Sequence, residues 1–377
     1  MITSFSSPLG EVGRGLESAH DREAAPVKIT WTVDDASAPV GSAPVPKNRP
    51  DPYHVLLSEL MLQQTQVSTV VAYFARFVAR LPTIQALAQA HEQEVLRLWQ
   101  GLGYYSRARH LHAAAKAIVA RHGGIVPADV KSLLELPGVG RYTAGAIASL
   151  AYETRAPILD GNVQRVLCRV YGIEADPRDR TVNAKLWELA DAILPKRRIG
   201  DFNSSLMELG ATVCTPKSPA CPTCPVRLHC IAQQKGLQDR IPPARKAKPS
   251  PQLHRWVFCI AHKGKWLIEQ RPAKGRWAGL WQFVTIPAGN AASPKATDLA
   301  HLGLKVNRLI RLGTIRHALT HRRYQFEAFA CHLTGQLPAS TQPRAWVAPA
   351  ELVHYPLSRP QLLIAELAFA GEPTPRP

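Results

Sequence analysis

The sequence has no run of eighteen apolar residues, and this absence excludes a membrane-spanning helix. Its first 25 residues lack the basic and then apolar pattern of a secretory signal, and they contain four acidic residues. Only seven cysteines occur in 377 residues, which disfavours a disulfide-stabilised secreted domain. Together these absences predict a protein of the reducing cytoplasm that has no membrane partner.

Acidic residues are also scarce relative to basic ones. The chain has 28 Asp and Glu against 46 Lys and Arg, which gives a formal net charge of +18. This excess predicts a polyanionic partner, and nucleic acid is the usual one. A basic protein without such a partner is the alternative, because charge alone does not identify a ligand. A chain of this length is long for a single hydrophobic core, so two domains are expected.

The chain changes character along its length. Residues 1–50 show no sustained periodicity and end in a group of prolines, so we expect an irregular, atypical N-terminus. Residues 51–235 have helical periodicity and predict six or more short helices. Residues 236–252 are basic and rich in proline, which is typical of a linker. Residues 253–377 alternate like strands, with a Lys-Gly turn and a closing helix near 358–370, and predict an α+β domain.

Four cysteines lie within one loop of seventeen residues, with the spacing C-x6-C-x2-C-x5-C. They are Cys214, Cys221, Cys224 and Cys230. Four prolines interrupt any regular element in this loop, so we expect a metal centre to organise its backbone. Four thiolates suit either an iron–sulfur cubane or a tetrahedral zinc, and the spacing alone leaves both possible.

A short glycine-containing turn lies between two helical runs at 133–152. In Leu136-Pro137-Gly138-Val139-Gly140, the two glycines permit a tight hairpin whose backbone N–H groups point outward. The next helix is expected to begin at about Arg141, and its N-terminal dipole would add to this anion site. A DNA phosphate is the natural ligand, although an ordinary turn between two helices is the simpler interpretation.

These features together resemble a known superfamily. The hairpin, the run LDGNVQRV with Asp160 twenty residues after Gly140, and the cysteine loop are similar to the helix–hairpin–helix DNA glycosylases of the endonuclease III superfamily. Within it, SELMLQQTQV (58–67), GLGYYSRARHLH (101–112) and ILDGNVQRV (158–166) resemble the MutY family of adenine DNA glycosylases. The similarity runs from about residue 51 to 233, and residues 254–333 resemble the MutY C-terminal domain.

The resemblance implies a fold, a reaction and a cofactor. The fold would be a helical glycosylase domain with a [4Fe–4S] cluster on the cysteine loop, followed by an α+β Nudix-like domain. The reaction would be base excision repair: hydrolysis of the N-glycosidic bond of adenine opposite 8-oxoguanine or guanine in duplex DNA. We therefore expect a monomer that works in the bacterial cytoplasm, associated with the nucleoid.

Two carboxylates are candidates for the chemistry of base removal. Glu59 lies in the apolar run LLSELML, which would favour its protonated form near neutral pH. The resemblance implies that it is the general acid for adenine, and the simpler alternative is a surface glutamate. Asp160 could stabilise the cationic sugar, or could be only the N-cap of the helix that follows. The resemblance implies a catalytic Asp160, with Asn162 positioning the water and the sugar.

A missing lysine bears on the type of glycosylase. Bifunctional relatives have a lysine just after the hairpin that forms a Schiff base with the sugar, and this chain has Tyr142 there. Gln164 also replaces a lysine found in some relatives. We therefore predict a monofunctional enzyme. The resemblance implies that Tyr142 lines the adenine pocket, whereas an unmatched tyrosine would simply contribute to packing.

Several other polar residues are candidates for contact with DNA. Gln63, Gln64 and Tyr104 have flat side chains that could fill the gap left by an extruded base. The resemblance implies that Gln64 and Tyr104 lie at the lesion. The alternative for the two glutamines is that they are ordinary polar residues on an exposed helix face. The alternative for Tyr104 is that it packs in the core. Arg107 and Arg109 are expected either to contact phosphates or to form a solvated basic face.

The C-terminal domain lacks the carboxylates that its resemblance to Nudix hydrolases would require. The tract GNAASPKATDLAHLG stands where an R-E-x-x-E-E cluster would hold Mg²⁺, so diphosphate hydrolysis is not expected. The resemblance implies instead that this domain recognises 8-oxoguanine. Leu319, Thr320 and His321 stand where relatives have a Phe-Ser-His tract, and the aliphatic Leu319 replaces the aromatic wedge.

The N-terminus departs most from the family. Residues 1–50 show neither the amphipathic helix nor the Leu-Pro-Trp segment that MutY-like proteins have before the helix containing Glu59. We interpret this as a start in the wrong frame rather than a divergent enzyme, because the other core motifs agree with one another. Two further alternatives are another iron–sulfur mismatch glycosylase, such as one for thymine, and a catalytically impaired lesion-binding protein.

Overall fold

The computed structural model describes residues 49–244, 249–289 and 293–370. The chain divides into two compact units: Met1–Ala88 with Ala113–Lys246, and Gln89–His112 with Ala247–Pro377. The predicted N-terminal segment, except for its last two residues, and part of the predicted linker lie outside the described residues. Within the described ranges, no helix is both long enough and apolar enough to cross a membrane.

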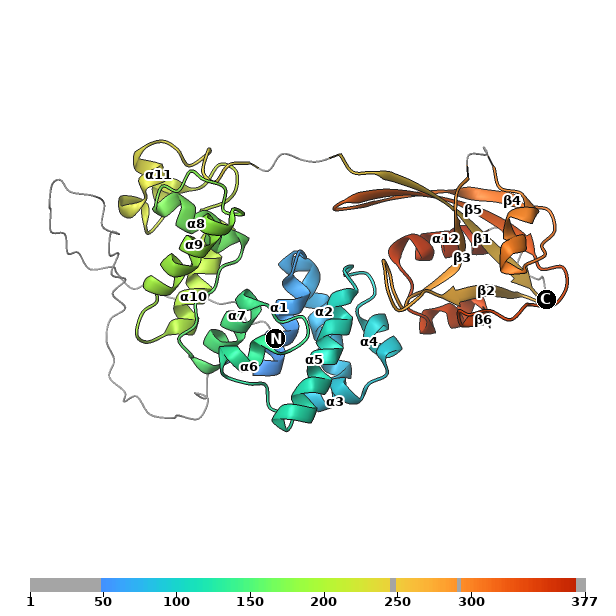
Figure 1. The fold of residues 1–377 in the computed structure, drawn as a ribbon, viewed down its shortest axis with the longest axis horizontal. Helices are drawn as coiled ribbons and strands as arrows, with labels where there is room; N and C mark the ends of the chain where they lie inside the picture. Colours follow the sequence, from blue (N-terminus) through green and yellow to red (C-terminus); the bar gives the residue numbers. More distant parts are fainter. Residues whose placement is uncertain (1–48, 245–248, 290–292, 371–377) are drawn as a thin grey trace. The chain divides into compact units, whose positions relative to one another are not determined.

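The first unit is helical, as the periodicity of the sequence predicted (Figure 1). Its helices up to the cysteine loop are α1 (Pro52–Leu62), α2 (Val67–Arg80), α3 (Ile84–Gln89), the second half of α5 (Ser106–His122), α6 (Val130–Leu134), α7 (Arg141–Tyr152), α8 (Gly161–Val170), α9 (Arg180–Ala192) and α10 (Ile199–Glu208). A π-helical turn η1 (Leu209–Val213) leads into the loop, which contains the short turns η2 (Cys221–Thr223) and η3 (Arg227–His229) and ends at α11 (Ile231–Gln234).

A polar run divides the first long apolar stretch into two helices. The sequence from 54 to 81 keeps helical periodicity throughout, yet α1 ends at Leu62 and α2 begins at Val67. Between them Gln64 has φ +58°, a left-handed conformation that ends a helix. Four polar residues, QQTQ, occupy this break and have no apolar face to bury. The break therefore presents glutamine side chains at the end of α1.

A close approach fixes α7 against the segment that precedes α8. A methyl group built on Gly145 would lie 2.2 Å from the carbonyl oxygen of Pro157, so only glycine fits this helical position. On the next turn, the Ser149 hydroxyl donates to the Gly145 carbonyl at 2.7 Å, and Asn203 of α10 donates to Ser149 at 2.9 Å. This packing places α7 and the start of α8 next to each other, and both contribute residues to the site described below.

The second unit is built around one mixed sheet (Figure 1). Its strands are β1 (Gln252–His262), β2 (Lys265–Gln270), β3 (Trp281–Pro287), β4 (Ile310–Leu319), β5 (Arg322–His332) and β6 (Arg344–Val347). They are arranged in the order β4-β5-β1-β3-β2-β6, with β1 and β5 parallel and the other neighbours antiparallel. The unit also contains α4 (Glu92–Leu98), the first half of α5, η4 (Ala296–Leu302), η5 (Pro349–His354) and α12 (Arg359–Ala370).

The central strand of this sheet is buried on both faces. Alternate residues of a strand point to opposite faces, so Val257 and Cys259 join a core that contains Ile364 of α12. Trp256 and its alternate neighbours face the other core, which contains Leu299 of η4. Strand β1 therefore has an almost continuous apolar run instead of a simple alternation.

The fold class expected from the sequence is confirmed. A helical domain is followed by an α+β domain, and α7 begins at the predicted Arg141. The predicted turn at Lys263 and Gly264 joins β1 to β2, with φ values of +49° and +69°. The predicted closing helix is α12, which runs from Arg359 to Ala370.

Gly145→Ala should destabilise the protein. Alanine has a higher helix propensity than glycine by up to about 1 kcal/mol, but the clash with the Pro157 carbonyl should cost about 1–3 kcal/mol by overpacking. We expect a lower melting temperature. Gly161→Ala is the matched control, because Gly161 begins α8 with open space around its Cα and should not be destabilised. Equal stability of the Gly145 variant and the wild type would contradict this packing argument.

Candidate active site and cysteine loop

Glu59 is a buried carboxyl group on α1, which confirms that its surroundings are apolar. Its side chain is 7% exposed, and its neighbours Leu56, Leu57 and Leu60 are at most 1% exposed. Burial raises the pKa of Glu59 to about 7, a hydrogen bond with Tyr142 opposes this rise, and the charge of Asp160 adds to it. The simple alternative of a surface glutamate is therefore wrong. At neutral pH an appreciable fraction of Glu59 is protonated and can donate.

Tyr142 is the second residue of α7 and lies close to Glu59. Its hydroxyl donates to the sulfur of Met207 on α10 at 3.2 Å. Burial, with the nearby charges of Glu59 and Asp160, raises the pKa of Tyr142 far above its usual range, so the phenol stays neutral. Met207 was not predicted from the sequence, because nothing in its run FNSSLMELG indicates a polar contact. The site thus combines a titrating carboxyl with a permanently neutral hydroxyl.

Asp160 is the N-cap of α8, as one of the two sequence interpretations proposed. Its Oδ1 accepts from the Val163 backbone N–H at 2.7 Å, and the residue is half-buried. The cap fixes the carboxylate at the helix N-terminus, where the macrodipole favours its negative charge. Asp160 also contributes to the pKa shifts of Glu59 and Tyr142, so the three side chains form one electrostatic group.

Asn162 is connected to the cysteine loop by an arginine that the sequence analysis did not select. Arg165, which is 9% exposed, donates from Nη2 to the Asn162 Oδ1 at 2.8 Å and to the Gly210 carbonyl at 2.7 Å. Its Nε donates to the Cys214 carbonyl at 2.7 Å. A methyl group on Gly210 would lie 2.6 Å from Asn162 Cβ, so this glycine permits η1 to pack closely on α8.

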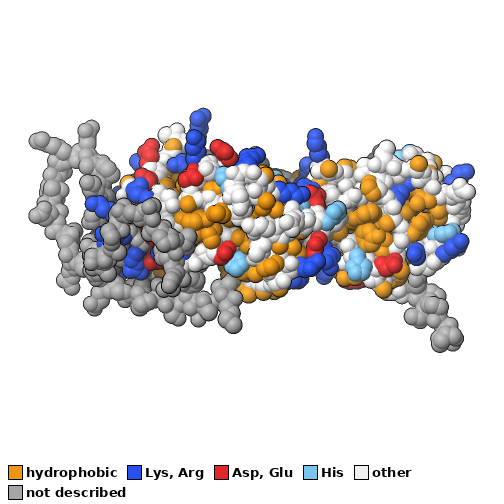
Figure 2. Space-filling view, turned by 90° about the horizontal axis from the view of Figure 1, so that it is seen from below, with side chains coloured by type: hydrophobic (Ala, Val, Ile, Leu, Met, Phe, Trp, Pro, Cys, Tyr) orange, Lys and Arg blue, Asp and Glu red, His pale blue; other side chains and the backbone are white. Residues whose placement is uncertain are grey.

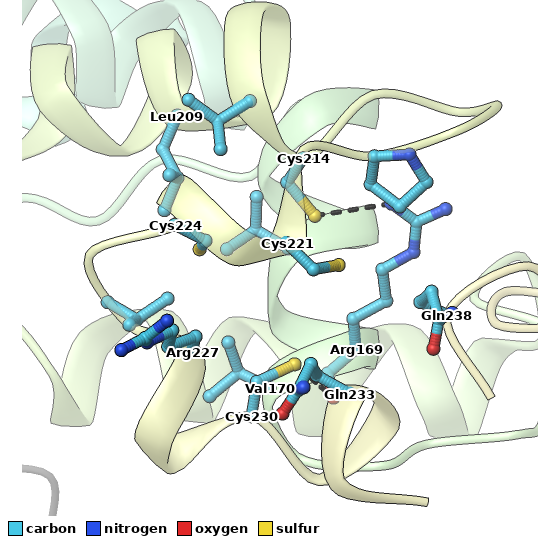
Figure 3. Close-up of a pocket in the computed structure, with 14 residues that line it drawn as sticks. Arg169, Val170, Leu209, Cys214, Cys221, Cys224, Arg227, Cys230, Gln233 and Gln238 are labelled. Atoms are coloured by element: carbon cyan, nitrogen blue, oxygen red, sulfur yellow. Dashed lines mark hydrogen bonds between the residues drawn. The ribbon is translucent and has the colours of Figure 1, made fainter. Parts of the chain in front are cut away.

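The four cysteines of the loop surround one largely apolar pocket (Figure 3). None of the four forms a disulfide, and Val166, Val170 and Leu209 are among the other residues that line the pocket. Burial raises the pKa of the Cys224 and Cys230 thiols, so thiolates here need a nearby positive charge. Within the part of the chain that the structure describes, no group of three or more His, Cys, Asp or Glu is arranged to hold a metal ion.

Arg169, one turn after Arg165 on α8, provides a positive charge at this pocket (Figure 3). It is 2% exposed, and its Nη1 lies 3.3 Å from the Cys214 sulfur and donates to the Thr215 carbonyl at 2.7 Å. Its Nε donates to the Ile241 carbonyl at 2.8 Å. The sequence contained a signal for both residues: two arginines four apart in the otherwise apolar run VQRVLCRVYG.

The hairpin has the geometry of a backbone anion site. Gly138 has φ +79°, the Val139 N–H donates to the Leu136 carbonyl at 3.1 Å, and Gly140 is the N-cap of α7 without a side-chain bond. Leu136 and Val139 are buried, whereas Gly138 and Gly140 are exposed. A ligand would therefore meet glycine backbone and the first N–H groups of α7, not the apolar side chains.

The predicted strand-reading glutamines lie at the end of α1. The Gln63 amide donates to the Thr143 hydroxyl on α7 at 3.4 Å, which brings Gln63 next to the helix that carries Tyr142. Gln64 has the left-handed conformation described above and is exposed. These two residues therefore belong to the same unit as Glu59, Tyr142 and Asp160.

Tyr104 belongs to the second unit, together with the predicted lesion-recognition residues. It has φ +47°, and its hydroxyl is hydrogen-bonded to the hydroxyl of Thr320. Leu319 ends β4, and Thr320 and His321 form the exposed two-residue turn to β5. Core packing is therefore the wrong alternative for Tyr104, which is 45% exposed.

The expectation of a solvated, DNA-facing side chain is wrong for Arg107, and for Arg109 it stays a prediction. Arg107 is 6% exposed, lies over the Trp99 and Tyr104 rings at 5.4 and 5.5 Å, and donates to the Leu102 and Gly103 carbonyls. Burial lowers its pKa to about 10. Arg109 donates to the Ala278 carbonyl at 2.5 Å. Arg107 is therefore buried within the second unit, and the half-buried Arg109 contacts a backbone carbonyl of the same unit.

Basic side chains are spread over the surface. Figure 2 shows Lys and Arg side chains at several places on the coloured part of the face in view, together with hydrophobic side chains, His and some Asp and Glu. The exposed Lys217 and Arg227 lie on the cysteine loop. Such a distribution is consistent with long-range attraction to a polyanion.

Two parts of the chain are similar to known protein families. Residues 57–192 match the HhH-GPD superfamily of base excision DNA repair proteins, and residues 255–367 match the NUDIX domain. An adenine DNA glycosylase of Buchnera aphidicola subsp. Baizongia pistaciae is 32% identical over 72% of this chain and 76% of its own length. The chain belongs to the adenine DNA glycosylase family.

Other relatives are more similar but longer. The adenine DNA glycosylase of Rattus norvegicus is 39% identical over 77% of this chain, and this chain covers 66% of the rat protein, slightly less than two thirds. Among solved structures, a thermostable thymine-DNA glycosylase overlaps 49% of this chain and 85% of its own, with 30% identity and a TM-score of 0.45.

The substitution Glu59→Gln should increase the free energy of unfolding of the protein at alkaline pH. The folded pKa of about 7 exceeds the ordinary value of 4.5, so the folded state binds more protons and loses stability as pH rises through this window. Removing the titration should raise stability by up to about 3 kcal/mol at pH 8 and by less than about 1 kcal/mol at pH 5.

Melting temperatures of the wild type and the Glu59 variant at the two pH values would measure this difference. Glu188→Gln is the control, because Glu188 is an exposed glutamate on α9. An identical shift at pH 5 and pH 8 would show that Glu59 does not titrate abnormally.

Proposed function

We propose that the chain is a monofunctional adenine DNA glycosylase of base excision repair, which removes adenine mispaired with 8-oxoguanine or guanine. The observation that carries the proposal is the buried Glu59 carboxyl, with a pKa of about 7, grouped with Tyr142 and Asp160. A carboxylic acid that is still protonated at neutral pH is what protonation of a poor leaving group requires.

In the proposed reaction, adenine leaves the base stack and enters the site beside Glu59. Glu59 donates a proton to a ring nitrogen, and the glycosidic bond then breaks with its electron pair going to the base. The neutral Tyr142 hydroxyl borders the same space and can hydrogen-bond the base without competing for the proton. Because Glu59 is buried, its proton is held away from bulk water until the base arrives.

Bond cleavage leaves a positively charged sugar, which Asp160 would stabilise. Its carboxylate is fixed by the Val163 cap through Oδ1, so the group is oriented before substrate binds. Water then adds to the anomeric carbon and transfers a proton to the Glu59 carboxylate, which restores the acid. Asn162, held by Arg165, would orient this water and the sugar. The absence of lysine at 142 and 164 favours hydrolysis without a Schiff base.

Duplex DNA would be held mainly through its phosphates. The backbone around Gly138 and Gly140 and the start of α7 form the proposed phosphate site, with Leu136 and Val139 anchoring it from inside. Gln63 and Gln64 would occupy the space vacated by adenine. Tyr104, Leu319, Thr320 and His321 would recognise 8-oxoguanine, and the hydrogen bond between Tyr104 and Thr320 supports treating them as one surface.

We further propose a [4Fe–4S] cluster on Cys214, Cys221, Cys224 and Cys230. The four thiols line one pocket, and the resemblance of their spacing to the endonuclease III superfamily favours a cluster over zinc. When bound, the cluster would supply the cross-links that order a loop rich in proline. Arg169 would offset part of its negative charge.

The domain limits and cellular location stay proposals. We assign residues 51–235 to the glycosylase domain, 236–252 to the linker and 253–377 to the recognition domain. The grouping of Gln89–His112 with the C-terminal sheet means that the recognition domain also uses a segment of the glycosylase domain. We expect a monomer in the bacterial cytoplasm, associated with the nucleoid through DNA.

Single-turnover adenine release from a duplex with 8-oxoguanine opposite adenine tests the function. Wild-type protein should yield a product strand only after alkali treatment, and Glu59→Gln should be slower by at least about 10²-fold. The wild-type rate should fall as pH rises above about 7, because the protonated fraction of Glu59 falls.

Glu188→Gln serves again as the control and should retain the full rate. Release of thymine instead of adenine would favour a mismatch glycosylase of different specificity. Tight DNA binding without release of any base would mean that the chain is a lesion-binding protein and would overturn the proposed activity.

Iron and acid-labile sulfide analysis tests the cofactor. We expect about four irons and four sulfides per chain in the purified protein, and loss of both in Cys221→Ser together with a lower melting temperature. Cys259→Ala is the matched control, since Cys259 lies in the core of the other unit and should leave the iron content unchanged. One zinc per chain and no sulfide would refute the cluster.

A further inference from the structure

The Tyr142 hydroxyl lies between two hydrogen-bond acceptors on different helices. It donates to the sulfur of Met207 on α10 at 3.2 Å. It also forms the hydrogen bond with Glu59 on α1 that lowers the pKa of this carboxyl. A phenol has only one hydrogen, so it cannot donate to both groups at full strength. The acceptor that this hydrogen faces therefore affects how strongly an ionised Glu59 is stabilised.

The two acceptors differ in strength, and the difference depends on the protonation of Glu59. An ionised carboxylate is a strong acceptor, whereas a thioether sulfur is a weak one. We expect the Tyr142 hydrogen to face Glu59 when Glu59 is ionised, and to face the Met207 sulfur when Glu59 is protonated. The sulfur therefore stabilises the arrangement in which Glu59 keeps its proton.

The packing of α10 on α7 keeps Met207 next to Tyr142. Both side chains are half-buried and pack against the same core of the helical unit. Asn203 lies four residues before Met207, so the two share one face of α10. The buried Asn203 amide donates to the Ser149 hydroxyl at 2.9 Å and to the Ala156 carbonyl at 3.0 Å. These hydrogen bonds hold α10 against α7 at the turn that precedes Met207.

Asp160 is the other charged group that acts on Glu59 and Tyr142, and its charge favours the protonated form of both. The remaining charged or titrating residues of the surrounding helices are exposed or have other contacts. The exposed ones are Arg76, Arg80, Arg141 and Glu208. Those with other contacts are His54, Arg165, Arg169 and Asp201.

We propose that Met207 is a positioning residue for the acid: by accepting the Tyr142 hydroxyl, it keeps this hydrogen away from Glu59 and helps Glu59 to retain its proton until the base arrives. Only the direction of the Tyr142 hydrogen changes, and no covalent bond forms or breaks at the sulfur. The inference rests on the proposed function for its role in adenine release. The exchange of hydrogen-bond partners itself needs no DNA, so it can be tested separately.

Methyl NMR spectra of the full chain, recorded without DNA, test this exchange. The chain has only three methionines, so labelling their methyl carbons gives few signals, and Met207→Leu identifies that of Met207. We expect the Met207 signal to shift with pH with a midpoint of about 7, the pKa of Glu59. The shift should be absent in Glu59→Gln and in Tyr142→Phe, and should be retained in the control Glu188→Gln.

A Met207 signal that does not move between pH 5 and pH 9 would overturn the proposal. A shift that persists in Tyr142→Phe, with an unchanged melting temperature, would also overturn it. In that case the sulfur would respond to the charge of Glu59 through space and not to the phenol hydrogen.

Met207→Leu should lower the pKa of Glu59 by about half a unit to one unit, because the Tyr142 hydrogen loses its sulfur acceptor. Leucine conserves the side-chain volume, so the fold should be kept. Loss of polarity alone would raise this pKa, so the direction of the shift separates the two effects. NMR titration of the labelled glutamate carboxyl carbons measures it, and Glu59→Gln identifies the Glu59 signal. In the Tyr142→Phe background, Met207→Leu should cause no downward shift.

An unchanged or raised pKa of Glu59 in Met207→Leu would overturn the proposal. In single-turnover assays of adenine release, the alkaline fall of the rate should move to lower pH by the same amount as the pKa. An unmoved fall of the rate, despite a lowered pKa, would overturn the role of Met207 in the reaction. The expected titrations without any adenine release would support the hydrogen-bond exchange and would overturn only the proposed function.

Discussion

The candidate active site depends on one physical constraint: a carboxyl group must stay out of water. Glu59 lies between leucines on α1, and the packing of α7 against the segment before α8 brings Tyr142 and Asp160 to it. Desolvation is the largest cause of its raised pKa and outweighs the opposing effect of the hydrogen bond with Tyr142. If this packing loosened and water entered, the pKa would fall towards its ordinary value and the acid would be ionised at neutral pH.

The two arginines of α8 couple this site to the cysteine loop. Arg165 contacts Asn162, the carbonyl of Gly210 and the carbonyl of Cys214, and Arg169 contacts the Cys214 sulfur. Both are charged groups in a mostly apolar helix. Their N–H groups donate hydrogen bonds largely to backbone carbonyls of η1 and the loop. An ordered loop is therefore a condition for an ordered Asn162, because the same guanidinium group holds both.

Much of the candidate active site could be predicted from the sequence, because local chemistry determines it. The apolar run around Glu59, the glycines of the hairpin and the capping position of Asp160 each require a specific environment, and the structure provides it. The contacts of Met207, Arg165 and Arg169 could not be predicted, because they join elements that are far apart in the chain. The prediction for Arg107 was wrong for the same reason. A basic residue in GLGYYSRARHLH is expected on the surface as long as the backbone carbonyls that accept its hydrogen bonds are unknown.

The division of the chain has a consequence for the order in which it can fold. Gln89–His112 belongs with a sheet that begins about 140 residues later, and strand β1 pairs in parallel with β5 across a long intervening segment. Contacts between residues far apart in the sequence form slowly, because closing a long loop costs conformational entropy before the contacts can offset that cost. During synthesis α4 and the start of α5 must wait for the C-terminal strands to emerge. Until those strands are made, the hydrogen bonds that join Gln93 to Gly279 and Trp281 cannot form, so this segment lacks part of its native packing during synthesis.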